Sequence, residues 1–133
     1  MQVLERRKAM AITPLLRLAF RPFFLGGCLL AVLVIPLWLA AFSGLIGHWT
    51  PAGGWLGWHR HELLFGFGLA IIAGFLLTAV KAWTGHATPR GAVLGALVVL
   101  WLAARIAAFT APYAVYAALD VLLVPVVALL LLR

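Results

Sequence analysis

The feature that most constrains this chain is a run of 26 residues, 22–47, that contains no charged side chain. An α-helix of about 20 apolar residues crosses a hydrocarbon layer of about 30 Å, because each residue adds about 1.5 Å. Further long apolar runs follow it. Hydrophobic residues make up 66% of the chain and charged residues 10%, whereas about a quarter of a soluble domain is charged. The sequence therefore predicts an all-α integral membrane protein.

We predict a single membrane domain, 1–133, built as a bundle of four transmembrane helices. The predicted spans are residues 23–46, 62–80, 91–109 and 112–132. Before them, the segment PLLRLAFR mixes apolar and basic residues, as a short helix lying at the bilayer surface does.

The Lys and Arg residues predict which side of the membrane each loop faces. Basic residues flank spans mainly on the cytoplasmic side. If the N-terminus is cytoplasmic, Arg60 and Arg105 alone lie toward the opposite side. The cytoplasmic set is then Arg6, Arg7, Lys8, Arg17, Arg21, Lys81, Arg90 and Arg133. We therefore expect both termini in the cytoplasm and the lipid bilayer as partner, and we expect no nucleic-acid binding despite the net charge of +7.

Small residues recur at a spacing of four on two of the predicted spans. Gly66, Ala70 and Gly74 mark one face of the second span, and Gly91 and Gly95 open the third. Such stripes let two helices approach closely. We interpret both as packing surfaces. One hypothesis for the function is a non-catalytic helical assembly, or an accessory membrane subunit, that packs through the Gly66/Ala70/Gly74 face.

Polar chemistry is concentrated in WHRHELLFGFG, residues 58–68, at the start of the second predicted span. Imidazole is a ligand for copper, iron and zinc. On a helical wheel His59 and Glu62 share the small-residue face, whereas His61 points about 160° away from His59, so a helical pair cannot bind one metal. In an extended segment, residues two apart share a face and could do so. His48 is the other histidine predicted close enough to contribute.

The alternative is that this block has a structural role. Glu62 in the first turn of a helix would stabilise the positive N-terminal end, and histidines at headgroup depth cost little. Cys28, the single cysteine, excludes a disulfide, and the absence of C-x-x-C-H means that any haem is held non-covalently. The sequence shows no Ser-His-Asp set, paired acids or phosphate loop that would indicate a hydrolase or a kinase.

A second polar pair lies within the last two spans. Arg105 and Asp120 are about equally far from the short connection 110–112. Antiparallel helices joined by so short a turn bring such residues to similar depth. We predict an intramembrane ion pair, because pairing lowers the cost of placing each charge in the bilayer. It serves as structural glue or, in a weaker hypothesis, as part of a proton or ion pathway.

Three blocks resemble the NnrS family. They are RPFF at 21–24, WHRHELLFGF at 58–67, and AGFLLTAV followed by WTG within 73–85. Their order and separation fit the opening part of that family, over about residues 15–86. Arg60 stands where the family usually has a small residue.

The resemblance implies a haem- and copper-containing protein of the bacterial inner membrane, linked to the nitric oxide response and relief of nitrosative stress. Its cofactors would be haem b and copper, with His59 and His61 as ligands and Glu62 and His48 in supporting positions. Family members form larger bundles, so we expect this chain to be a fragment, or to associate with other transmembrane helices or a missing C-terminal part. Whether it is an enzyme stays open.

Overall fold

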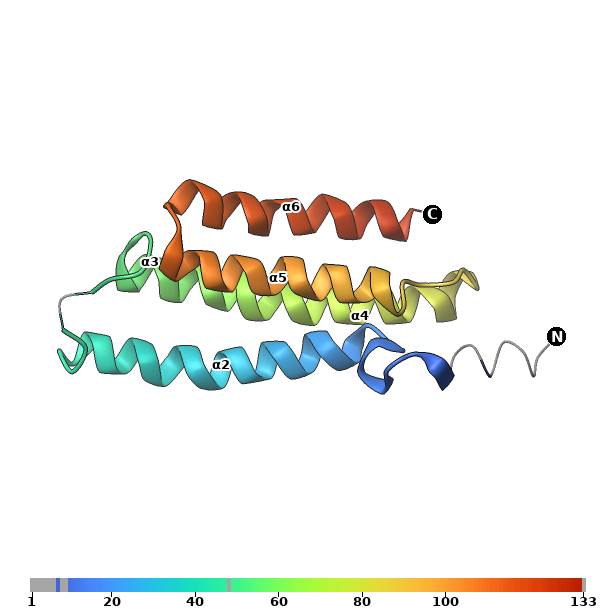
Figure 1. Ribbon diagram of the computed structural model, residues 1–133, viewed down its shortest axis with the longest axis horizontal. Helices are drawn as coiled ribbons and strands as arrows, with labels where there is room; N and C mark the ends of the chain where they lie inside the picture. Colours follow the sequence, from blue (N-terminus) through green and yellow to red (C-terminus); the bar gives the residue numbers. More distant parts are fainter. Residues whose placement is uncertain (1–6, 8–9, 48, 133) are drawn as a thin grey trace.

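The structure is a computed structural model that describes residue 7, residues 10–47 and residues 49–132, and over these residues it contains helices and no strand. Four straight rods lie side by side along their length (Figure 1), with α2 and α6 on opposite sides of α4 and α5. The elements are η1 (Pro14–Leu16), α2 (Phe20–Phe42), α3 (Gly54–His61), the π-helix η2 (Glu62–Gly68), α4 (Leu69–Thr84), α5 (Ala92–Thr110) and α6 (Tyr113–Leu131).

In the described part of the chain, four helical stretches are long and apolar enough to cross a membrane: Phe20–Phe42, Gly54–Thr84, Ala92–Thr110 and Tyr113–Leu131. The outward side chains fit this class. Val32 is 69% exposed and Leu33 64%, which suits hydrocarbon and not water. The predicted class, a multi-pass all-α membrane protein, is confirmed.

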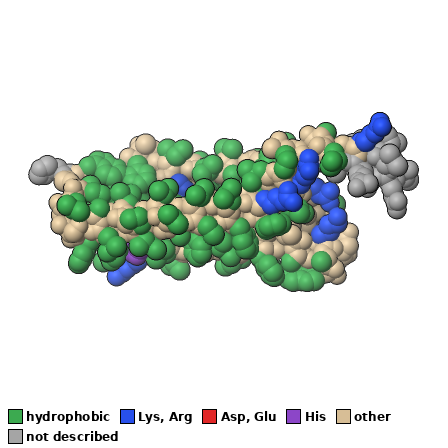
Figure 2. Space-filling view, turned by 90° about the horizontal axis from the view of Figure 1, so that it is seen from below, with side chains coloured by type: hydrophobic (Ala, Val, Ile, Leu, Met, Phe, Trp, Pro, Cys, Tyr) green, Lys and Arg blue, Asp and Glu red, His purple; other side chains and the backbone are tan. Residues whose placement is uncertain are grey.

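The two ends of the bundle differ in charge. Figure 2 shows Lys and Arg side chains gathered toward one end of an otherwise largely apolar face. We call this end, where α2 and α5 begin and α4 ends, the basic end. It is held together by the Phe20 N–H, which donates to Thr78 Oγ1 at 3.0 Å, and by the Gly91 N–H, which donates to Leu16 O at 2.9 Å. The opposite end carries α3 and the turn between α5 and α6, and we call it the motif end.

The last two spans lie within one residue of the ranges we predicted, but the first two do not. The first helix ends at Phe42 rather than at 46, because Gly44 adopts φ +77° and reverses the chain. The second begins at Gly54 rather than at 62, after Gly53 with φ +83°. The block WHRH is therefore inside a continuous helix, where we had expected it to precede one.

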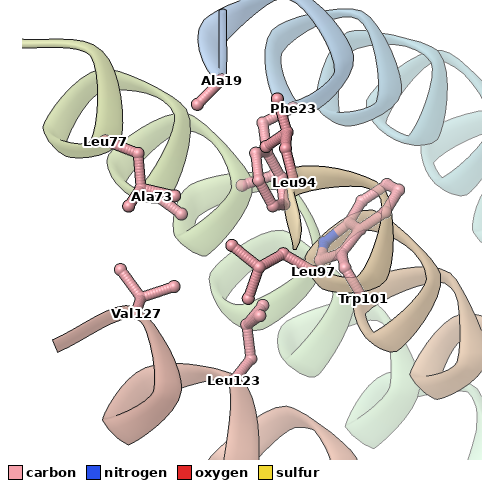
Figure 3. Packing of buried hydrophobic residues seen from close by; sticks show 10 residues of the cluster. Ala19, Phe23, Ala73, Leu77, Leu94, Leu97, Trp101, Leu123 and Val127 are labelled. Carbon is pink, nitrogen blue, oxygen red and sulfur yellow. The ribbon is translucent and has the colours of Figure 1, made fainter. Parts of the chain in front are cut away.

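Packing between the helices depends on close approach and on a buried apolar core. Figure 3 shows Phe23 of α2, Leu94 and Trp101 of α5 and Leu123 of α6 among the side chains of one buried apolar cluster. Helices in a bilayer associate through such van der Waals packing, since lipid is as apolar as the side chains. The remaining members of this core are Ala19, Ala70, Ala73, Leu77, Leu97 and Val127.

The small-residue stripe of the second span packs against α2 within this chain. A Cβ added at Gly74 would lie 2.9 Å from the Cβ of Phe23, and one added at Gly27 would lie 3.4 Å from the Cβ of Ala70. Gly66, Ala70 and Gly74 are all buried. The face is therefore covered, and the hypothesis that it docks another chain is wrong.

Gly91 and Gly95 contact the segment before α2. Gly91, with φ +58°, precedes the first residue of α5, and a Cβ added to it would touch Ile12 at 3.9 Å. A Cβ added to Gly95 would lie 3.5 Å from Leu16 Cδ1. This second stripe is thus a packing surface for the chain's own N-terminal part.

Candidate functional site

Five polar side chains from three membrane-crossing stretches meet near the motif end. His61 ends α3, Glu62 begins η2, Arg105 comes from α5, and Tyr116 and Asp120 come from α6. We call these five residues the ionic cluster. Glu62 and Asp120 are each 1% exposed and Arg105 is 7% exposed. Charges buried this deeply in a membrane protein must be paired, because an isolated charge there costs several kcal/mol.

Arg105 is the centre of the ionic cluster. Its Nε lies 2.8 Å from Glu62 Oε2, its Nη2 donates to Asp120 Oδ2, and its Nη1 donates to the Phe65 carbonyl at 3.2 Å. The predicted ion pair between Arg105 and Asp120 is thus present, at similar depth on two antiparallel helices. What the spacing did not show is that one guanidinium serves two carboxylates.

Glu62 lies in the interior of the helix and does not cap it. Its Oε1 accepts a hydrogen bond from the Tyr116 hydroxyl at 2.8 Å, while its Oε2 faces Arg105. Since the helix begins at Gly54, Glu62 is not in a first turn. The capping alternative for Glu62 is therefore wrong, and a buried ionic role replaces it.

The π-helix lets α5 attach to the backbone of the second span. A π turn is wider than an α turn and leaves carbonyl groups without their usual partners. The Gly66 carbonyl accepts a hydrogen bond from Trp101 Nε1 at 2.9 Å, and the Phe65 carbonyl accepts the one from Arg105. Two side chains of α5 thus bind to backbone carbonyls of the π-helix.

The two histidines of the motif contact different helices. The His59 ring stacks on Trp38 of α2, with ring centroids 4.3 Å apart and an interplanar angle of 16°. The His61 ring stacks on Tyr116 of α6 at 4.1 Å, and its Nε2 lies 2.8 Å from Asp120 Oδ2. The extended geometry that would let both bind one metal does not occur, because both lie in α3. His48 lies outside the described residues.

The described side chains do not form a ligand set for copper at the motif. Among the described residues, no group of three or more His, Cys, Asp or Glu side chains is arranged to hold a metal ion. The exposed Cys28 lies on α2, away from the motif. The geometry therefore does not fit a copper ion shared by His59 and His61, and we assign copper no position.

The chemistry of His59 fits a haem, whose iron its imidazole would hold. Its Nδ1 is buried and has no hydrogen-bond partner among the described residues. Trp38, on which it stacks, also lines a groove of about 340 Å³. The other lining residues are Ala41, Phe42, Trp55 and Leu56. An aromatic, apolar groove next to an imidazole whose Nδ1 no described residue engages is the kind of environment that flat apolar ligands occupy.

An aromatic cluster surrounds this end of the molecule. Trp49 stacks on Phe109 at 5.2 Å, and Trp55 lies edge-on to both Trp49 and Trp58, at 5.8 and 5.5 Å. Trp side chains favour the membrane–water interface. The cluster therefore supports placing the motif end at an interface.

Four helical stretches long and apolar enough to cross a membrane, three of which contribute to a buried ionic cluster toward the motif end, define a multi-pass α-helical membrane protein. The chain belongs to the NnrS family, because the family model for the NnrS protein matches residues 14–133. This match continues past the blocks within 15–86 and includes α5 and α6, which supply Arg105 and Asp120. No curated protein and no solved structure matches the chain.

Proposed function

We propose that this protein is a haem-binding NnrS-type protein of the bacterial inner membrane that acts in the nitric oxide response and relieves nitrosative stress. His59 would hold the haem iron through its imidazole. The observation that carries the proposal is the His59 ring, held flat against Trp38 with a buried Nδ1 that no described residue engages.

The surroundings of His59 support a planar, largely apolar ligand. Trp38 stacks on the imidazole and, on α2, also on Phe42 with ring centroids 5.6 Å apart. Trp55 and Leu56 close the groove from α3. These side chains fix the orientation of the His59 ring and exclude water beside it. A haem held by this imidazole would supply an iron that can bind a small gaseous ligand.

The proton- or ion-pathway hypothesis finds less support. The members of the ionic cluster lie together near the motif end. Toward the basic end, the described core that follows is apolar and includes Leu94, Leu97, Leu123 and Val127. Among the described residues, the buried polar or charged side chains are Glu62, Arg105 and Asp120, all members of the ionic cluster, so we favour a structural role for the cluster.

Spectroscopy of the purified protein tests the proposal. The protein is expressed in bacterial membranes, extracted in mild detergent, reduced, and its visible spectrum is recorded before and after addition of nitric oxide. We expect a Soret band that shifts with nitric oxide, and its loss in His59→Ala. Arg60→Ala, at the exposed neighbouring position, is the matched control and keeps the band. A folded wild-type protein without a Soret band contradicts the proposal.

A further inference from the structure

The hydrogen bonds at Asp120 define what His61 can do. Arg105 Nη2 and His61 Nε2 contact the same oxygen, Asp120 Oδ2. A guanidinium only donates, so this oxygen accepts, and a ring nitrogen 2.8 Å from a carboxylate oxygen that accepts must itself donate. Nε2 of His61 therefore carries its hydrogen and donates it to Asp120, which ties the ring to α6.

The His61 ring is also enclosed on its faces. It stacks on Tyr116 with an interplanar angle of 26°, and its centroid lies 4.8 Å from that of Phe65. Its side chain is 11% exposed. These contacts hold the ring among the side chains of α6 and η2, whereas His59 faces α2.

His61 lies at the junction between α3 and the π-helix. His61 is the last residue of α3, and the π-helix begins at Glu62. A π turn carries one residue more than an α turn, and its conversion to an α turn would rotate the helix before it by about 100°. Such a rotation would take His59 away from Trp38. The bonds of His61 and Glu62 to α5 and α6 oppose it.

We infer that His61 is a positioning residue: through its hydrogen bond to Asp120 it holds α3 in the rotation that presents His59 to Trp38 and the aromatic groove. The part of this inference that concerns haem rests on the proposed function. The part that concerns the His61–Asp120 bond stands on geometry alone.

Two substitutions at position 61 separate the roles. His61→Gln keeps an N–H donor at similar reach but removes the imidazole, and His61→Phe keeps an aromatic ring against Tyr116 but removes the donor. Each is made in the wild-type chain and in an Asp120→Leu chain, which lacks the acceptor. The readouts are the thermal unfolding midpoint in detergent, the Soret band position, and the haem content per protein.

If His61 acts through Asp120, Gln restores the unfolding midpoint, Soret position and haem content of the wild type, while Phe lowers the midpoint and reduces haem content at least twofold. In the Asp120→Leu chain, Phe has no further effect on the midpoint. Equal loss of haem in the Gln and Phe variants, or a Phe effect that is unchanged by Asp120→Leu, overturns the inference.

The proposed function and this inference can fail separately. If no variant, including the wild type, binds haem, the proposed function falls. The unfolding midpoints of the two His61 variants, each made in the wild-type and the Asp120→Leu chain, still decide whether His61 and Asp120 act together. If His61→Phe does not fold, the His61→Gln variants still test the inference. Gln can replace His61 only where Asp120 is present to accept its hydrogen bond, so His61→Gln should match its parent's unfolding midpoint in the wild-type chain.

Discussion

Replacing Gly66 by Ala places a methyl group directly against the ionic cluster. Its Cβ would lie 2.5 Å from Leu30 Cδ2, 2.6 Å from Glu62 Oε2 and 3.2 Å from Arg105 Nη1. The Leu30 methyl can move, but the Glu62 carboxylate is held by Arg105 and by Tyr116. The methyl group can therefore be accommodated only if the ionic cluster loosens.

The expected cost combines opposing effects. Forcing one methyl group into a packed core costs about 1–3 kcal/mol, and weakening a hydrogen bond to a charged group costs about 1.5–3 kcal/mol. Alanine recovers about 0.5–1 kcal/mol of helix stability over glycine. We expect Gly66→Ala to lower the free energy of unfolding by about 2–4 kcal/mol.

Two other glycines serve as controls. At Gly57 an added Cβ meets nothing within 4 Å, so Gly57→Ala is expected to be neutral or to stabilise by up to about 1 kcal/mol. At Gly74 it would lie 2.9 Å from Phe23 Cβ, far from the charges, so Gly74→Ala carries the packing cost alone.

Reversible unfolding in mixed micelles, followed by circular dichroism at increasing sodium dodecyl sulfate, measures all three variants. The expected order of stability is Gly57→Ala, then Gly74→Ala, then Gly66→Ala. If Gly66→Ala is as stable as Gly57→Ala, the close approach of the backbone at position 66 to the ionic cluster is refuted.

Three further predictions follow from individual contacts and from the charge pattern. Trp101→Phe removes the donor to the Gly66 carbonyl and should cost about 1 kcal/mol in the same unfolding assay; an unchanged midpoint would show that this bond is not formed. Tyr116→Phe leaves Glu62 Oε1 buried without its donor and should cost about 1–3 kcal/mol, with a wild-type value as the contrary result. Reporter enzymes fused to the two ends of the chain should both report the cytoplasm, and one inserted in the connection 49–53 should report the opposite side; a cytoplasmic signal from the insertion would reverse the predicted orientation.

The ion pair between Arg105 and Asp120 could be predicted because chain connectivity alone fixes the depth of both residues. A short turn between antiparallel helices leaves little freedom in register. The participation of Glu62 could not be predicted in the same way, because it depends on how the second span is placed against α5 and α6, which are distant in sequence.

The π-helix was missed for a physical reason. A helical wheel assumes a constant rotation per residue, and an extra residue in one turn shifts the phase of everything before it. The π-helix at 62–68 therefore changes the rotation of His59 and Glu62 relative to Ala70 and Gly74, with which the wheel had grouped them, and the two residues contact Trp38 and Arg105. The glycines at 66 and 68 in ELLFGFG allow a π turn, but their presence is not enough to predict one.

The predicted start of the second span, residue 62, is wrong because the polar residues 59–62 resemble the end of a loop before a membrane helix. A helix in a bilayer can include charged residues when partners from neighbouring helices compensate them. Glu62 has such partners, and the left-handed turn at Gly53 and Gly54 is the true start. The small-residue stripe predicted close packing correctly, yet its spacing did not show that the partner is α2.

The most direct test of the account is the amount of haem iron per protein molecule in a matched pair of purified variants, His59→Gln and His61→Gln. The two substitutions are chemically identical and two positions apart. We expect His59→Gln to lose the haem iron and His61→Gln to retain the wild-type amount. Loss from His61→Gln, or full retention by His59→Gln, would contradict it.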